Sequence, residues 1–135
     1  MKRTLFDSVK ALPYTPGEAA DRTGALSAIL AIHVADADPD AKATITLTHC
    51  DTEDGAFEDF LDDRLFRDET EVEMDAKGQI TAVSASIPIA VDDLLNVDID
   101  LLGCKRYICV EVECTGSADT SCVLVLGDYD QNPPG

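Results

Sequence analysis

The chain has 135 residues, of which 45% are hydrophobic, so it can bury the core of one domain without help from a disulfide bond or a metal ion. Its 27 acidic and 10 basic residues give a formal net charge of −17. Such a surface repels the phosphate groups of nucleic acids and of anionic membranes, so we expect neither as a partner.

The first 24 residues predict an N-terminal arm followed by a loop, because Pro13, Pro16 and Gly17 interrupt regular structure. Larger apolar residues are spaced along this segment and form the candidate protein interface: Leu5, Phe6, Val9, Leu12 and Tyr14. They pack either on their own domain or on a neighbouring molecule, and both interpretations stay open. The first 14 residues carry a net charge of +2, which favours docking on an acidic neighbour or on the acidic body of another copy.

Residues 25–128 predict the folded domain. Ala25 to Val34 is so rich in apolar residues that we expect a buried strand. Residues 44–50 alternate, with Ile45 and Leu47 on one face, which indicates a strand with one buried side.

Residues 51–75 concentrate the acidic charge, with twelve acids against two arginines. Asp51 to Gly55 predicts a turn; its resemblance to a calcium loop is poor because the glycine is at the fifth position and not the sixth. Residues 56–66 fit either a short helix or an irregular loop. Residues 72–74 predict a short strand.

The C-terminal half contains the clearest strands. Residues 97–101 alternate between apolar and acidic side chains. Tyr107 to Cys114 and Ser121 to Leu126 alternate as well, and the turn between them predicts an antiparallel hairpin. Six to eight strands with regular turns predict an all-β fold, an antiparallel β-sandwich of the jelly-roll or Greek-key type, with a loose tail over residues 129–135.

Residues suited to catalysis are few. The chain has two histidines, His33 and His49, and neither belongs to a known catalytic motif, so we expect both to be structural. We therefore predict no enzyme activity, no cofactor and no metal. The five cysteines are an odd number in a chain without an export signal, which predicts free thiols in the core; a Cys114–Cys122 disulfide is the alternative.

Four segments together resemble capsid decoration (cement) proteins of tailed bacteriophages. These segments are residues 8–13, residues 46–57, residues 97–107, and residues 125–128 ahead of a proline-rich end. The resemblance implies a jelly-roll sandwich with an extended arm, made in the host cytoplasm and bound to the outer capsid surface of the virion. It also implies that the partners are the major capsid protein and further copies of the chain, in a dimer or trimer. The alternatives are a tail, neck or baseplate component, and a calcium- or carbohydrate-binding module.

Overall fold

The computed structural model describes residues 9–67 and 70–129, which contain ten β-strands and no helix. Within these residues there is accordingly no helix long and apolar enough to cross a membrane. The strands are β1 (Val9–Tyr14), β2 (Ala19–Asp21), β3 (Ala25–Ala37), β4 (Lys42–Cys50), β5 (Glu58–Asp59), β6 (Thr70–Met74), β7 (Ile80–Pro88), β8 (Leu94–Asp100), β9 (Tyr107–Thr115) and β10 (Ala118–Tyr129).

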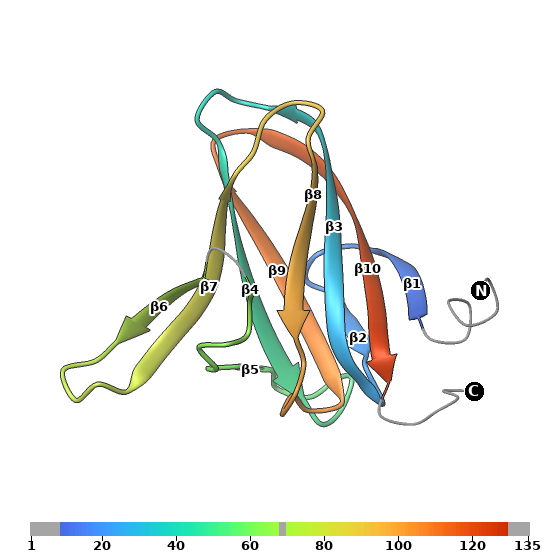
Figure 1. The fold of residues 1–135 in the computed structure, drawn as a ribbon, viewed down its shortest axis with the longest axis vertical. Helices are drawn as coiled ribbons and strands as arrows, with labels where there is room; N and C mark the ends of the chain where they lie inside the picture. The colour runs from blue at the N-terminus through green and yellow to red at the C-terminus, as the bar shows by residue number, and fades with distance from the viewer. Residues whose placement is uncertain (1–8, 68–69, 130–135) are drawn as a thin grey trace.

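The strands form two antiparallel sheets that pack face to face (Figure 1). The four-stranded sheet, here sheet A, has the order β1-β10-β3-β8. The six-stranded sheet, here sheet B, has the order β2-β9-β4-β7-β6, and β5 pairs with β4. With β5 and β6 set aside as additions after β4, this connectivity is that of an eight-stranded jelly roll. The predicted all-β, jelly-roll-like sandwich is confirmed.

The core lies between the sheets and is built by alternation along each strand. Successive side chains of a strand point to opposite faces, so every second residue is buried. The largest fully buried side chains come from both sheets and, at Leu65 and Leu101, from loops: Leu30, Ile32, Ile45, Leu47, Leu65, Ile99, Leu101, Ile108, Leu124 and Leu126. The burial of Ile45, Leu47 and Ile99 confirms the faces expected for residues 44–50 and 97–101.

The buried strand expected at residues 25–34 is confirmed as part of β3, but it is buried on one side only. In β3 only every second side chain is buried; Ile29 is 38% exposed and His33 is exposed as well. β3 lies inside sheet A between β10 and β8, and only one side of this sheet is covered by sheet B. Apolar composition alone did not distinguish the covered side from the open one.

The N-terminal segment differs from the predicted arm and loop. β1 pairs with β10 from Val9 to Tyr14, and β2 pairs with β9, so the described part of this segment belongs to both sheets. Tyr14 is a core residue at 7% exposure, and Leu12 is half-buried. Leu5 and Phe6 lie outside the described residues, as does most of the predicted tail.

The predicted hairpin of the last two strands is wrong. β9 pairs with β2 and β4 in sheet B, whereas β10 pairs with β1 and β3 in sheet A. The chain crosses between the sheets at Gly116, which has a φ of 78°. Both strands have alternating apolar residues because each contributes to the shared core, and this pattern does not reveal which strand is the hydrogen-bonded neighbour.

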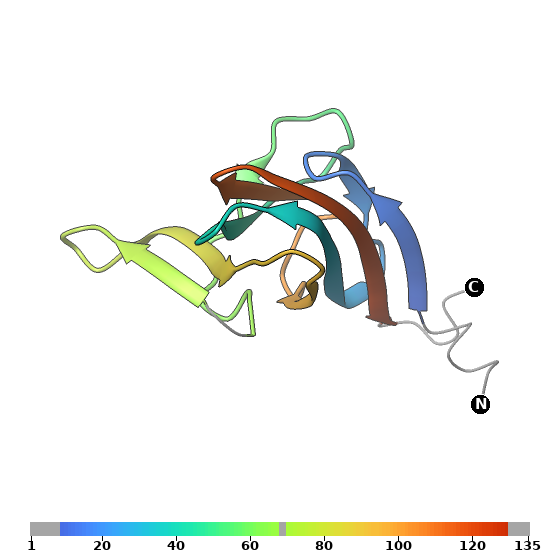
Figure 2. The same ribbon diagram turned by 90° about the horizontal axis from the view of Figure 1, so that it is seen from above.

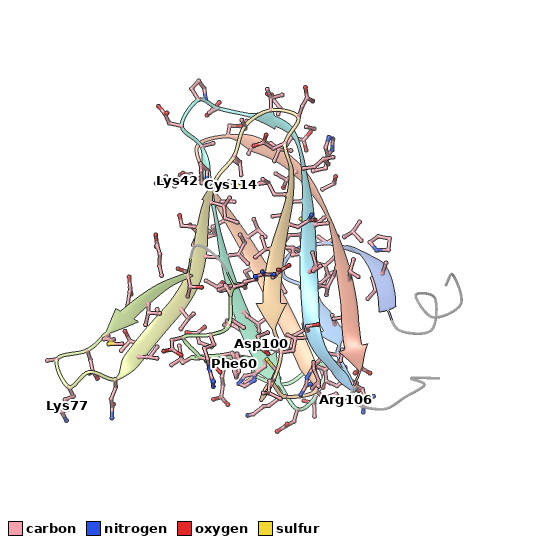
Figure 3. All side chains as sticks on the ribbon, in the orientation of Figure 1. Lys42, Phe60, Lys77, Asp100, Arg106 and Cys114 are labelled. Atoms are coloured by element: carbon pink, nitrogen blue, oxygen red, sulfur yellow. The ribbon has the colours of Figure 1, made fainter. Side chains whose placement is uncertain are left out.

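β6 and β7 form a hairpin that projects from the sandwich (Figures 1 and 2). The first half of β7 pairs only with β6, and Lys77 at the turn lies far from Lys42 and Asp100 on the body (Figure 3). The turn itself is well bonded, since the Asp75 carboxylate accepts hydrogen bonds from the backbone N–H groups of Lys77 and Gln79.

Residues 56–66 form an irregular loop, the second of the two predicted alternatives, with the short strand β5 and no helix. This loop buries Leu65 and Phe66.

Candidate functional site

The outward side of sheet A is the surface that distinguishes this molecule. Strand register aligns its side chains in rows that run across β1, β10, β3 and β8, the strands that lie side by side in Figure 1. One row is Pro13–Val123–Ala31–Asn96, the next is Ala11–Val125–Ile29–Asp98, and the outer rows are Ser121–His33–Leu94 and Gly127–Ser27–Asp100. We call this surface the A face.

The middle of the A face is apolar and open to solvent. Val123 is 39% exposed, and Leu94, the first residue of β8, is 79% exposed. Together with Ile29 they form an apolar area around the smaller side chain of Ala31. Covering apolar surface contributes roughly 25 cal/mol for each Å² removed from water, so this area favours contact with another molecule.

Two hollows lie on the A face because small and large residues alternate along β3. One hollow is centred on Ala31 and is bordered by His33, Leu94, Asn96, Ser121 and Val123. The other is centred on Ser27 and is bordered by Ile29, Arg64, Arg67, Asp98 and Asp100. The larger side chain of Ile29 stands between them. The A face therefore has a protruding apolar side chain with a hollow on each side of it.

The charged residues of the A face lie along one part of it. The charged residues in the A-face rows are Asp98 and Asp100, both near one end of β8, and Asp98 is paired with Arg67 at 3.3 Å. On sheet B, the exposed Glu111 and Glu113 of β9 stand beside threonines of β4. In a chain with a net charge of −17, β10 and β3 contribute no carboxylate to these rows.

The five interface residues predicted from the sequence are not brought together on this surface. Tyr14 packs on its own domain, which is the alternative left open: its hydroxyl donates to the Glu18 carbonyl at 2.5 Å and accepts from the Val110 N–H at 2.9 Å. Burial raises the pKa of Tyr14 well above its usual range, so the hydroxyl keeps its proton. Leu12 alternates with the A-face residues of β1 and is half-buried. An interface role for Leu5, Phe6 and Val9 stays a prediction.

Sequence reasoning missed the A face. Ile29, Ala31 and Val123 lie in strands that the sequence predicts, but residues 25–34 are expected to form a buried strand. Leu94 and Asn96 precede the strand predicted over residues 97–101, and Ala11 and Pro13 lie in the predicted arm and loop. The available signal was that two polar residues share a strand with Ile29: Ser27 lies two residues before it and His33 lies four residues after it. That spacing places the three side chains on one side of a strand, and two polar members argue for the open side.

The two histidines differ in their exposure to solvent. His33 is exposed in an outer row of the A face, whereas His49 is half-buried against Phe60 with its ring centroid 5.0 Å away. Nδ1 of His49 accepts the backbone N–H of Lys105 at 3.1 Å, and burial, with the charge of Lys105, lowers the pKa of this histidine.

All five cysteines are free thiols, as expected, and the alternative Cys114–Cys122 bridge is not formed. Cys104, Cys109 and Cys122 are buried, and burial raises the pKa of the Cys104 thiol to about 12. These thiols therefore serve as small core side chains. Among residues 9–67 and 70–129, no three His, Cys, Asp or Glu side chains are grouped so as to hold a metal ion.

Comparison of the chain with protein-family models, curated proteins and solved structures finds no match. The geometry of the described residues defines the class of protein as a jelly-roll β-sandwich with an apolar area on one outer face.

Proposed function

We propose that this protein is a non-enzymatic structural component of a tailed-bacteriophage particle, a decoration protein on the outside of the head that stabilises contacts between capsid subunits. The observation that carries the proposal is the A face. An apolar area of this kind on an otherwise acidic protein is typical of a surface that binds protein.

Two further features support the proposal. The jelly roll is an architecture that viral capsid proteins use, although a fold by itself does not define a function. The net charge of −17 suits a position outside the shell, because an acidic protein is repelled by the phosphates of packaged DNA.

Particles of the phage that encodes this chain provide the test. Mass spectrometry of purified virions should detect the protein in many copies, and antibodies raised against it should label the outer head surface in electron microscopy. Heads that lack the protein should break at a lower temperature than complete heads. Label confined to the tail, the neck or the baseplate would overturn the decoration role, and absence from virions would overturn a structural role altogether.

A further inference from the structure

We infer that the A face binds the A face of a second copy, so that the protein forms a twofold dimer in which the two sheets A pack against each other. This inference rests on the proposed function only in taking the A face as a protein interface. The arguments come from shape and from charge.

The shape argument concerns the positions of large and small side chains along β3. In a dimer with closed symmetry, the same patch of both copies forms the contact. We place the twofold axis in the plane of the interface, perpendicular to the strands, between the row of Ile29 and the row of Ala31. It places Ile29 of each copy over Ala31 of the other, and Val125 over Val123. The Ile29 side chain thus enters the hollow at Ala31 of the other copy. Packed sheets are rotated relative to each other, and this rotation shifts residues close to the axis, such as these two, the least.

The same axis gives the outermost apolar residue a partner. Leu94 is 79% exposed; the axis places it over Asp100 of the other copy, at the edge of the hollow, and places His33 over Ser27. The hollow at Ser27 is bordered by Arg64 and Arg67, whose aliphatic stems provide an apolar surface for the Leu94 side chain. Both hollows are therefore filled by residues of the same patch.

The charge argument concerns what faces Asp98. Under this axis Asp98 lies over Asn96 of the other copy, so the two Asp98 carboxylates do not face each other. Asp98 is also already paired with Arg67. Two chains of −17 repel, but β10 and β3 bring no carboxylate into these rows of the contact, and salt screens the remaining repulsion with a Debye length of about 8 Å at physiological ionic strength.

Sedimentation velocity of the full chain, over a wide range of concentrations, tests the dimer. We expect a concentration-dependent dimer that becomes stronger as NaCl is raised, because screening reduces the repulsion between two acidic chains. A contact with a basic partner protein would show the opposite dependence on salt. A chain that remains monomeric at every concentration and salt level would overturn the inference.

Substitutions test the position of the axis. Ile29→Lys and Ala31→Glu should each weaken the dimer at least tenfold, whereas Thr46→Glu, at an outward position on sheet B, should leave it unchanged. Mixing the Ile29→Lys chain with the Ala31→Glu chain should restore a mixed dimer, because the new ammonium group of one chain then faces the new carboxylate of the other. Circular dichroism confirms that each variant is folded. A mixture that stays monomeric would contradict this register.

The outcomes separate this inference from the proposed function. A monomeric protein that labels heads, and loses that label on Ile29→Lys substitution, would refute the dimer and leave the decoration role standing. A dimer that is absent from virions would refute the decoration role alone.

Discussion

Tyr14 joins the N-terminal edge strand to the opposite sheet through its hydroxyl group. The hydroxyl accepts the N–H of Val110 on β9 and donates to the carbonyl of Glu18. In Tyr14→Phe the Val110 N–H loses its acceptor in a buried environment, which costs about 1–3 kcal/mol. Urea unfolding should show this loss of stability, while Tyr107→Phe, a half-exposed tyrosine on β9, should change stability by less than about 0.5 kcal/mol. Equal effects of the two substitutions would contradict the role of the Tyr14 hydroxyl.

His49 makes the stability of the fold depend on pH. Its pKa is lowered in the folded protein, so the unfolded chain binds the proton more readily, and stability falls as the pH decreases through the ordinary histidine value of 6.5. Protonation also removes the lone pair that accepts the Lys105 N–H. The nearby Glu58 and Asp51 oppose this effect, while Lys105 and Arg22 strengthen it.

We therefore expect the parent protein to lose stability between pH 7 and pH 5, and His49→Gln to lose less over the same interval. Urea midpoints measured at several pH values provide the comparison. His33→Gln, at an exposed position on the A face, is the matched control and should follow the parent. If the parent and His49→Gln have the same pH dependence, His49 is not the group responsible.

The crossing from β9 to β10 is the element on which the jelly roll depends. Gly116 has a φ of 78°, and a Cβ added there would lie 3.2 Å from Oδ2 of Asp38. That carboxylate accepts the backbone N–H of Ser117 at 2.8 Å, which ties the crossing to the end of β3. The crossing is therefore specified by a backbone conformation and by one side-chain contact.

Gly116→Ala should destabilise the protein by about 1–2 kcal/mol from the left-handed backbone conformation, with an additional cost from the contact with Asp38. Gly78→Ala is the control, since Gly78 has a similar φ of 80° but nothing within 4 Å of the added Cβ. Thermal unfolding should therefore show a larger loss for Gly116→Ala than for Gly78→Ala. The reverse order would show that the Asp38 contact does not constrain the crossing.

The elements differ in how far the sequence could predict them. β4 and β8 were predictable because their alternation of buried and exposed residues is itself the signal. The partners of β9 and β10 were not, because strands of a sandwich have the same alternation whether they pair with each other or face each other across the core. The A face was missed for a related reason: Ile29 and Leu30 are equally apolar, and only the polar Ser27 and His33, on the same side of the strand as Ile29, indicate that Leu30 is the covered one.

For the whole molecule, the sandwich begins earlier in the chain than the sequence predicts. The sequence placed arm and loop over residues 1–24, but the pairing of β1 with β10 from Val9 onward makes residues 9–21 part of the sandwich. An interaction of Leu5 and Phe6 with another protein must therefore be tested by removing residues 1–8 only. A longer deletion would also remove an edge strand of sheet A and the hydrogen bonds of Tyr14.

Deleting residues 1–8 should leave the unfolding temperature unchanged within a few degrees and should reduce the binding of the protein to undecorated heads at least tenfold. Deleting residues 1–14 should instead lower stability by several kcal/mol, because a core tyrosine and one strand are lost. Co-sedimentation with heads measures binding, and calorimetry measures stability. If the protein without residues 1–8 still binds heads at full strength, Leu5 and Phe6 do not anchor it, and another surface of the protein provides the contact with the shell.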